Sequence, residues 1–291
     1  MNYKVTHTTK YIYQTPASLC HNIACQSPRA FPFQKVTSFS YTIDPEPHFL
    51  VERNDFFEND LICFSIQKTH NELQVKTISE IALSQPDWFN QDPSQSLSWE
   101  TVRENLQSTK TANHIRQFYL ESTHVTFVPG IKEYALESFT PGRPILEAMQ
   151  ELNSRIHRDF TFMPGFTEIS TPMEEVFKYK KGVCQDFAHF GLCCLRSIGL
   201  SARYMSGYIE TIPPPGKEKL VGADASHAWL ALYVPQTGWV EFDSTNNLIV
   251  SDQHIRVAIG RDFADVAPLK GIVYSGGGQE MVVKVDVNRL P

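Results

Sequence analysis

Long apolar runs are missing from this sequence, and so is the apolar core of a signal peptide. A membrane-spanning helix needs about 18 consecutive apolar residues, and no such run occurs. The first residues alternate between polar and apolar types from the start. Both features predict a cytoplasmic protein that makes no contact with a membrane.

The sequence also has few cysteines and no basic cluster. Its six cysteines are scattered through 291 residues and do not form the dense framework of a disulfide-stabilised protein. The 26 Lys and Arg residues are outnumbered by 32 Asp and Glu residues, which gives a net charge of -6. An acidic balance without a local positive patch argues against a general nucleic-acid-binding protein.

Motifs for metals and cofactors are absent as well. The adjacent pair Cys193 and Cys194 has no second pair to complete a zinc site. The glycines at 276–278 lack the Lys-Ser/Thr sequence that follows in a phosphate-binding loop, and they predict a tight turn. No acidic segment resembles the calcium loop of an EF-hand. The sequence therefore predicts neither a metal nor a cofactor.

The N-terminal third of the sequence consists of short alternating runs that are typical of β-strands. Pro, Asn or Asp residues bound these runs, which cover residues 5–13, 38–43, 60–66 and 73–78. Short alternating strands at close spacing predict an antiparallel sandwich or partial barrel over residues 1–88. No group of side chains in this part suggests catalysis.

The pattern changes after residue 88. Proline and polar turn residues between positions 85 and 96 predict a linker. Ser98 then has the sequence context of a helix N-cap, and apolar residues follow at helical spacing. The chain is long enough for two domains. We therefore expect one domain at residues 1–88 and a second at residues 89–291.

Cys184 stands where a glycine-containing turn meets a strongly apolar segment. From Phe187 to Ile198, apolar residues recur on one face of a helix. Cys184 then falls in the first turn, where unpaired backbone N–H groups and the positive end of the helix dipole favour an anion. A thiol in such a place loses its proton more readily, and the thiolate is the nucleophilic form. The sequence thus predicts a nucleophilic cysteine at the N-terminus of a buried helix.

Two strands further along the chain carry the groups that such a nucleophile needs. A β-type run begins near His227, and a second short run ends at Asp243. The residues between the runs have the length and composition of a hairpin turn, which would place His227 and Asp243 on neighbouring strands. A thiolate needs a base, and the base needs a group that orients it. Cys184, His227 and Asp243 are therefore the candidate catalytic residues.

Other residues compete for two of these roles. His189 follows Cys184 by five residues, which on a helix leaves it roughly 140° around the axis and makes it the weaker candidate base. Asp186 and Asp224 are weaker candidates for the acid. Asp186 lies on the helix itself, where a charge near the N-terminus has a simpler explanation, and Asp224 precedes the strand.

The segments around these residues resemble the transglutaminase-like superfamily, in the bacterial branch described as candidate cysteine proteases. The matching segments are 182–189, 199–208, 226–229, 238–246 and 254–262. The resemblance implies an α+β fold, with a papain-like or transglutaminase-like core of helices packed on an antiparallel sheet. It implies Cys184 as nucleophile, His227 as base and Asp243 as the orienting acid. Ser244 departs from the family, which usually has proline after the acid.

The resemblance extends to the flanking parts of the chain. Residues 1–88 are similar to the N-terminal β-domain that accompanies the bacterial core. Residues 160–167 resemble a short extended piece that comes before the nucleophile in the family, and we expect this piece to edge the active-site cleft.

The activity implied is acyl transfer at amide bonds of a peptide or protein substrate, through a thioester. Hydrolysis by a peptidase or amidase is the expected outcome, because the long accessory β-domains of animal transglutaminases are lacking. A transglutaminase with an amine acceptor and a non-catalytic peptide-binding module are the alternatives. The second donor to the oxyanion and the oligomeric state are left open.

Overall fold

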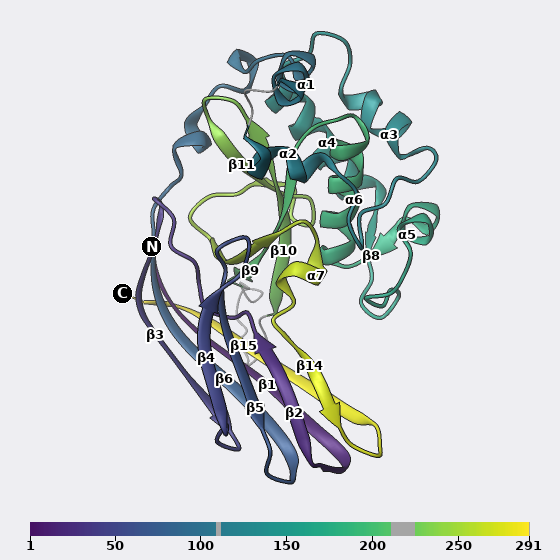
Figure 1. The fold of residues 1–291 in the computed structure, drawn as a ribbon. Coiled ribbons are helices and arrows are strands. Elements are labelled where there is room, and N and C mark those ends of the chain that lie inside the picture. Colours follow the sequence, from purple (N-terminus) through teal and green to yellow (C-terminus); the bar gives the residue numbers. More distant parts are fainter. Residues whose placement is uncertain (109–111, 211–224, 291) are drawn as a thin grey trace, which may run out of the picture.

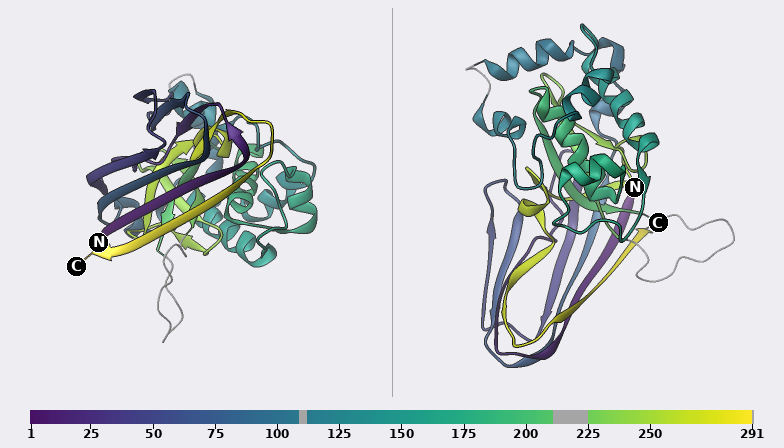
Figure 2. Two further views of the ribbon diagram at one scale, coloured as in Figure 1. Left: turned by 90° about the horizontal axis from the view of Figure 1, so that it is seen from below. Right: turned by 90° about the vertical axis from the view of Figure 1, so that its right-hand side faces the viewer.

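The computed structural model describes residues 1–108, 112–210 and 225–290. Its chain has an α+β architecture, as predicted, with long strands at one end of the molecule and the helices at the other (Figure 1; Figure 2). No helix in the described ranges is long and apolar enough to cross a bilayer.

Two four-stranded antiparallel sheets form the end that we call the β-part. The first sheet has the order β15-β1-β6-β3 and the second β14-β2-β5-β4. Their bounds are β1 (Asn2–Ala17), β2 (Leu19–Ala24), β3 (Gln34–Asp44), β4 (Phe49–Asn54), β5 (Asp60–Ile66), β6 (His70–Leu83), β14 (Leu269–Tyr274) and β15 (Gln279–Leu290). Apolar side chains from β1, β2, β5 and β6 are buried together between the sheets. Every strand predicted in the N-terminal third is present, and β2 and β4 are added to them.

The last two strands return to the beginning of the chain. β15 pairs antiparallel with β1, from Asn2 opposite Leu290 to Tyr13 opposite Gln279, and β14 pairs with β2. Figure 1 shows these yellow strands beside the purple N-terminal ones. The sequence assigned residues 269–290 to a second domain at 89–291, whereas their hydrogen bonds join them to the sheets of residues 1–88.

The helical part begins after two short 3-10 turns, η1 (Asp87–Asn90) and η2 (Pro93–Gln95). The Ser98 hydroxyl accepts a hydrogen bond from the Thr101 N–H and caps the first helix, as predicted. The remaining elements are α1 (Trp99–Gln107), α2 (Asn113–Arg116), η3 (Gln117–Tyr119), α3 (Ile131–Ser138), α4 (Ile145–Asp159), α5 (Met173–Tyr179), α6 (Cys184–Ser197) and α7 (Phe263–Val266). Helices α3, α4 and α5 pack around α6.

A five-stranded antiparallel sheet supports α6. Its order is β12-β11-β10-β9-β13, with bounds β9 (Ala202–Ile209), β10 (Ser226–Val234), β11 (Gly238–Asp243), β12 (Leu248–Ile249) and β13 (His254–Gly260). Helix α6 lies across β9 and β10 on one face. The approach is close at Gly191, where an added Cβ would collide with the Leu230 side chain. The predicted hairpin is confirmed, since Val234 pairs with Gly238 at its end.

The other face of this sheet packs on the β-part. Met205, Trp229 and Ala231 form an apolar cluster with Phe31 and Phe57. These two aromatic residues come from the loops that lead into β3 and β5, so the two parts share one buried interface.

Two buried amides add hydrogen bonds across the same interface. The Asn59 side chain donates to the Ile259 carbonyl at 2.7 Å and accepts from the Ile259 N–H at 2.9 Å. Gln34 does the same with Arg256, at 2.6 Å and 2.8 Å. β13 is thus held by the β-part along its length.

Candidate active site

Cys184 is the first residue of α6, as predicted, and its side chain is half-buried. The turn before it is fixed by Asp186, whose carboxylate accepts hydrogen bonds from the Val183 N–H and from the Thr167 hydroxyl, both at 2.7 Å. Burial raises the pKa of Asp186, and these two hydrogen bonds oppose the rise. Asp186 therefore caps the helix that presents the thiol.

The extended piece before the nucleophile runs beside the chain that enters α6. β7 (Thr161–Phe162) pairs in parallel with β8 (Lys181–Gly182), which ends two residues before Cys184. The hydrogen bond from Thr167 to Asp186 ties the end of this piece to the helix. Several apolar side chains on it are exposed, namely Phe162, Met163, Phe166 and Ile169. This piece therefore presents exposed apolar side chains beside the chain that leads to Cys184.

His227 and Asp243 lie on the two strands of the hairpin and contact each other. The His227 Nε2 and the Asp243 Oδ2 are 2.7 Å apart, with the carboxylate fully buried and the imidazole 8% exposed. Burial lowers the pKa of His227, but hydrogen bonds with Asp243 and Cys184, together with the charges of both, raise it to about 10. Since Nε2 is engaged by Asp243, Nδ1 is the ring nitrogen left to face the thiol.

A second histidine shares the same carboxylate oxygen. His254, the first residue of β13, places its Nε2 2.9 Å from the Asp243 Oδ2, and the Asn246 amide donates to this oxygen at 2.7 Å. Backbone N–H groups of Thr245 and Asn246 donate to Oδ1. Burial raises the pKa of Asp243, but the hydrogen bonds of His227 and His254, together with the positive charge of His227, hold it well below its usual range. The carboxylate is therefore ionised.

His254 and Asn246 were not identified as site residues from the sequence. His254 lies in one of the segments that carry the family resemblance, but β13 pairs with β9, and β9 separates it from β10. A local sequence pattern cannot reveal that two histidines from non-adjacent strands meet at one oxygen. The only signal was a polar residue at the start of an apolar strand. Burial lowers the pKa of His254, so its ring is neutral and donates from Nε2.

A buried network of ring contacts and hydrogen bonds around Trp229 supports the imidazoles of His227 and His254. The Trp229 ring stacks on His227 with centroids 5.9 Å apart and meets His254 edge-on at 5.0 Å. Its Nε1 donates to Glu241 at 2.7 Å, and Glu241 also accepts from the Arg256 Nε at 3.1 Å. All three partners are fully or almost fully buried.

Ser244 occupies the position where proline is usual. Its hydroxyl donates to the Asn153 side chain at 2.8 Å, and the Asn153 amide donates to the Asp243 carbonyl at 3.3 Å. Both residues are buried, and Asn153 lies on α4, so these hydrogen bonds attach the turn after Asp243 to that helix.

His189 and Asp186, the weaker candidates for the base and the acid, have other roles in the structure. Burial lowers the pKa of His189 to about 3, and its Nε2 accepts a hydrogen bond from the Phe263 N–H at 3.2 Å. A neutral, packed ring of this kind is no base for Cys184. Asp224 and the polar segment 213–219 lie outside the described residues. Trp239, in the strand that ends at Asp243, packs against Phe118.

His227, Asp243 and His254 also offer three ligand atoms within 4.8 Å of one another, a set that could hold a metal ion. The two imidazoles and the ionised carboxylate already satisfy each other through hydrogen bonds.

Chemically, the site combines a thiol at a helix N-terminus, a protonated imidazole and an ionised carboxylate. This combination can attack an electrophilic carbonyl and deliver a proton to the group that leaves.

Two family models match this chain. Residues 3–82 match the bacterial transglutaminase-like N-terminal region, and residues 132–244 match the transglutaminase-like superfamily. The second match spans Cys184, His227 and Asp243.

Individual relatives extend the match over the whole chain. An uncharacterized protein of Mycobacterium tuberculosis is 36% identical over 99% of this chain and 92% of its own length. The solved structure of a candidate cysteine protease from Cytophaga hutchinsonii has the same fold, with a TM-score of 0.79 and 18% identity over 100% of this chain and 91% of that one. A protein-glutamine gamma-glutamyltransferase of Pseudomonas aeruginosa is 29% identical over 40% of this chain and 18% of its own length.

Proposed function

The chain belongs to the transglutaminase-like superfamily, and we propose that it is a thiol acyl-transfer enzyme that acts on amide bonds of peptides or proteins. In this proposal Cys184 is the nucleophile, His227 the base and Asp243 the group that orients the base. One observation carries it: the His227 ring is fixed by Asp243 through Nε2, and both Asp243 and Cys184 raise the pKa of this ring.

The raised pKa of His227 determines the resting state of the pair. With a pKa of about 10, the imidazole is protonated at neutral pH, and its charge stabilises the thiolate of Cys184. The thiolate attacks the amide carbonyl, and the tetrahedral oxyanion is stabilised by the unpaired Cys184 N–H in the first turn of α6. Collapse of this intermediate breaks the C–N bond, and His227 gives its proton to the leaving amine.

Acylation of Cys184 lowers the pKa of His227, which prepares the ring to act as a base. Once Cys184 is a thioester, its negative charge and its hydrogen bond no longer raise the pKa of the imidazole. The neutral ring can then take a proton from water, which attacks the thioester and releases the acid. Asp243 keeps Nε2 protonated throughout, so that Nδ1 faces the reacting groups.

We favour hydrolysis, with a peptide or protein as substrate. Exposed apolar side chains lie beside the segment that leads to Cys184, namely Phe162, Met163, Phe166 and Ile169. Such a surface suits apolar residues of a polypeptide substrate. Transfer to an amine is the second candidate. The glutamyltransferase of Pseudomonas aeruginosa, which matches part of this chain, supports that possibility.

The enzyme would work in the cytoplasm. All six cysteines are free thiols, and a nucleophilic thiol must stay reduced to act. Fractionation of cells that produce the full chain, followed by immunodetection, tests this location. Recovery from the periplasm or the membrane fraction would contradict it.

Two products measured in parallel test the chemistry. A mixture of denatured proteins is incubated with the wild type, Cys184→Ala and the control Cys63→Ala, which removes another half-buried thiol. We expect the wild type and Cys63→Ala to release new amino termini, and Cys184→Ala to release none. Incorporation of a fluorescent cadaverine in excess over new termini would make the enzyme a transglutaminase. Peptide binding without either product would support a binding module.

A further inference from the structure

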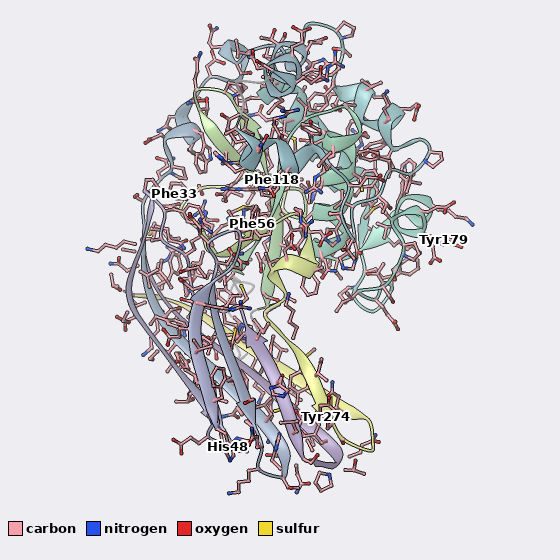
Figure 3. The ribbon with its side chains drawn as sticks, in the orientation of Figure 1. Phe33, His48, Phe56, Phe118, Tyr179 and Tyr274 are labelled. Carbon is pink, nitrogen blue, oxygen red and sulfur yellow. The ribbon has the colours of Figure 1, made fainter. Side chains whose placement is uncertain are left out.

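A cavity of about 510 Å³ lies at the junction between the β-part and the helical part, and we call it the junction cavity. Four Phe and Trp side chains line it: Phe56 and Phe57 from the loop before β5, Phe118 from η3 and Trp239 from β11. Figure 3 labels Phe56 and Phe118 at this level of the molecule, between the helices and the long strands. Arg29, Arg203 and His114 provide the basic groups of its wall, and Glu58 provides an acidic one.

The junction cavity is separate from the site of Cys184. On β9 and β10, Arg203 lies opposite Ala231, whereas His227 lies opposite Gly207. Four residues along a strand correspond to about 13 Å. The even spacing places Arg203 on the same face of the sheet as His227, at the other end of that face.

Arg203 is a buried cation that lacks a hydrogen-bonding acceptor. Its side chain is 8% exposed, and its guanidinium lies 4.5 Å above the centre of the Trp239 ring. Its Nε is buried without a partner, and no described residue accepts a hydrogen bond from the other guanidinium nitrogens. Burial lowers the pKa of Arg203 to about 9. An unpaired buried charge is costly, and an incoming anion would offset that cost.

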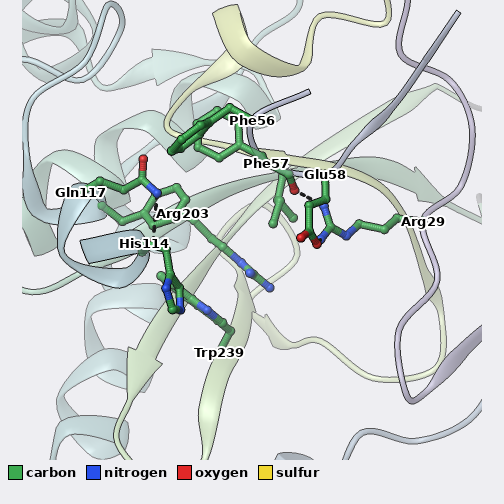
Figure 4. A pocket seen from close by; sticks show the side chains of 10 residues that line it. Arg29, Phe56, Phe57, Glu58, His114, Gln117, Arg203 and Trp239 are labelled. Carbon is green, nitrogen blue, oxygen red and sulfur yellow. Dashed lines mark hydrogen bonds and ion pairs between the residues drawn. The ribbon is translucent and has the colours of Figure 1, made fainter. Parts of the chain in front are cut away.

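The neighbouring charges are already matched. Arg29 pairs with Glu58 at 3.2 Å and also donates to the Phe57 carbonyl. Glu241, the nearest buried acid to Arg203 on the sheet, is bound by Arg256 and Trp229. Figure 4 shows Arg29 with Glu58 on one side of the cavity and Gln117 with His114 on the other. One positive charge, that of Arg203, is therefore left for a ligand among the described residues of the wall.

We propose that the junction cavity binds an organic monocarboxylate with an aromatic or other apolar body. The carboxylate would pair with the Arg203 guanidinium, whose planar fork matches two carboxylate oxygens. The body would pack against Phe57, Phe118 and Trp239. A volume of about 510 Å³ is that of a small-ligand site. A phosphate dianion fits less well, because Arg203 is the one unmatched positive charge among the described residues of the wall and leaves the second negative charge without a partner.

The test compares an acid with its own neutral amide on the wild-type full chain. 3-Phenylpropionate and 3-phenylpropanamide have the same body, and calorimetric titration at pH 7 measures their affinities. We expect the acid to bind at least about tenfold more tightly, and inorganic phosphate not to displace it. Equal affinity of acid and amide, or no binding of the acid at about 10 mM, would overturn the proposal. The second result would leave Arg203 as a purely structural cation stacked on Trp239.

A variant of Arg203 tests where the acid binds, and a peptide with a free C-terminal carboxylate tests whether the ligand is a chain terminus or a free small acid. Arg203→Met should weaken binding of the acid at least about tenfold, while the exposed control Arg158→Met should not change it. An unchanged iodoacetamide labelling rate at Cys184 would show that Arg203→Met is folded. If it does not fold, the comparison of acid and amide on the wild type decides alone. A tetrapeptide ending in a free Phe carboxylate that binds more tightly than 3-phenylpropionate would identify a chain terminus as the ligand, and the reverse a free small acid.

Discussion

At the residue scale, the site depends on one buried oxygen. The Asp243 Oδ2 accepts from His227, His254 and Asn246, and its carboxylate is fully buried. A buried carboxylate stays ionised only if donors surround it. The sequence identified Asp243 because it ends a strand of a hairpin with His227. It did not identify His254, because this residue lies on β13, which pairs with β9 and not with the hairpin strands β10 and β11.

We expect His254 to act as a positioning residue, by holding Asp243 in place. His254→Ala removes one donor from the Asp243 Oδ2 and should lower the rate at which Cys184 is acylated roughly 10- to 100-fold. The basic limb of the pH–rate profile should move to lower pH, because a less ordered Asp243 raises the pKa of His227 less. His254→Gln keeps an N–H donor and should recover most of the rate. If Ala and Gln variants behave alike, His254 only fills space.

The pKa of His227 gives a prediction for stability. Its value is raised from 6.5 to about 10 in the folded chain, so the folded state binds the proton more tightly than the unfolded one. This stabilisation is complete below pH 6.5 and is lost as the pH rises through 10. Asp243, whose pKa is depressed, has the opposite sign: its contribution is lost as the pH falls.

Urea unfolding of the wild type and His227→Gln across this pH range measures the effect. Between pH 6.5 and 10 the wild type should lose on the order of 2 kcal/mol more of its free energy of unfolding than the variant. Parallel curves for the two proteins would mean that His227 is not held as an imidazolium.

At the element scale, the features encoded by neighbouring residues were predictable. The apolar face of α6, its start at Cys184 and the hairpin of β10 and β11 depend on helical spacing and on turn residues. The close contact of α6 with the sheet was not predictable, because it depends on Gly191 facing Leu230 on a strand more than thirty residues away. Only the packed structure shows why this position has no side chain.

Gly191→Ala tests that contact. The new Cβ would collide with the Leu230 side chain in a fully buried layer, which costs about 1–3 kcal/mol, while the better helix propensity of alanine returns up to about 1 kcal/mol. We expect a net loss of about 1–2 kcal/mol in the free energy of unfolding, measured with urea. The control Gly276→Ala adds a Cβ at an ordinary 3.6 Å from Thr15 and should change stability by less than about 0.5 kcal/mol. Equal values for the two variants would contradict the close packing of α6.

At the scale of the whole molecule, the two ends of the chain meet in one sandwich. Alternation predicted a strand near residues 281–287, but alternation alone does not specify a partner, and β15 pairs with β1 at the other end of the sequence. The domain boundary expected at residue 88 was based on local composition, so it placed β14 and β15 with the helical part. Long-range pairing of this kind is visible only in the folded chain.

Asn59 tests how firmly the β-part is joined to the catalytic sheet. Asn59→Ala leaves the N–H and the carbonyl of Ile259 without partners in a buried interface, and each loss costs about 1–3 kcal/mol. We expect a loss of about 3 kcal/mol in the free energy of unfolding. The control Asn54→Ala removes an exposed hydrogen bond to Asp60 and should cost less than about 0.5 kcal/mol. If both variants unfold at the same urea concentration, the buried amide does not hold the parts together.

The central claim is that His227 activates Cys184, and the rate of iodoacetamide labelling tests it most directly. Labelling is followed across the pH range in the wild type and in His227→Ala, with each modified cysteine located by peptide mass analysis. Cys63 is the internal control, because its thiol is also half-buried. We predict that Cys184 labels fastest at neutral pH, and that His227→Ala slows Cys184 at least about tenfold and leaves Cys63 unchanged. If Cys184 labels no faster than Cys63, or its rate does not depend on His227, the thiolate–imidazolium pair does not form and the proposed activity is wrong.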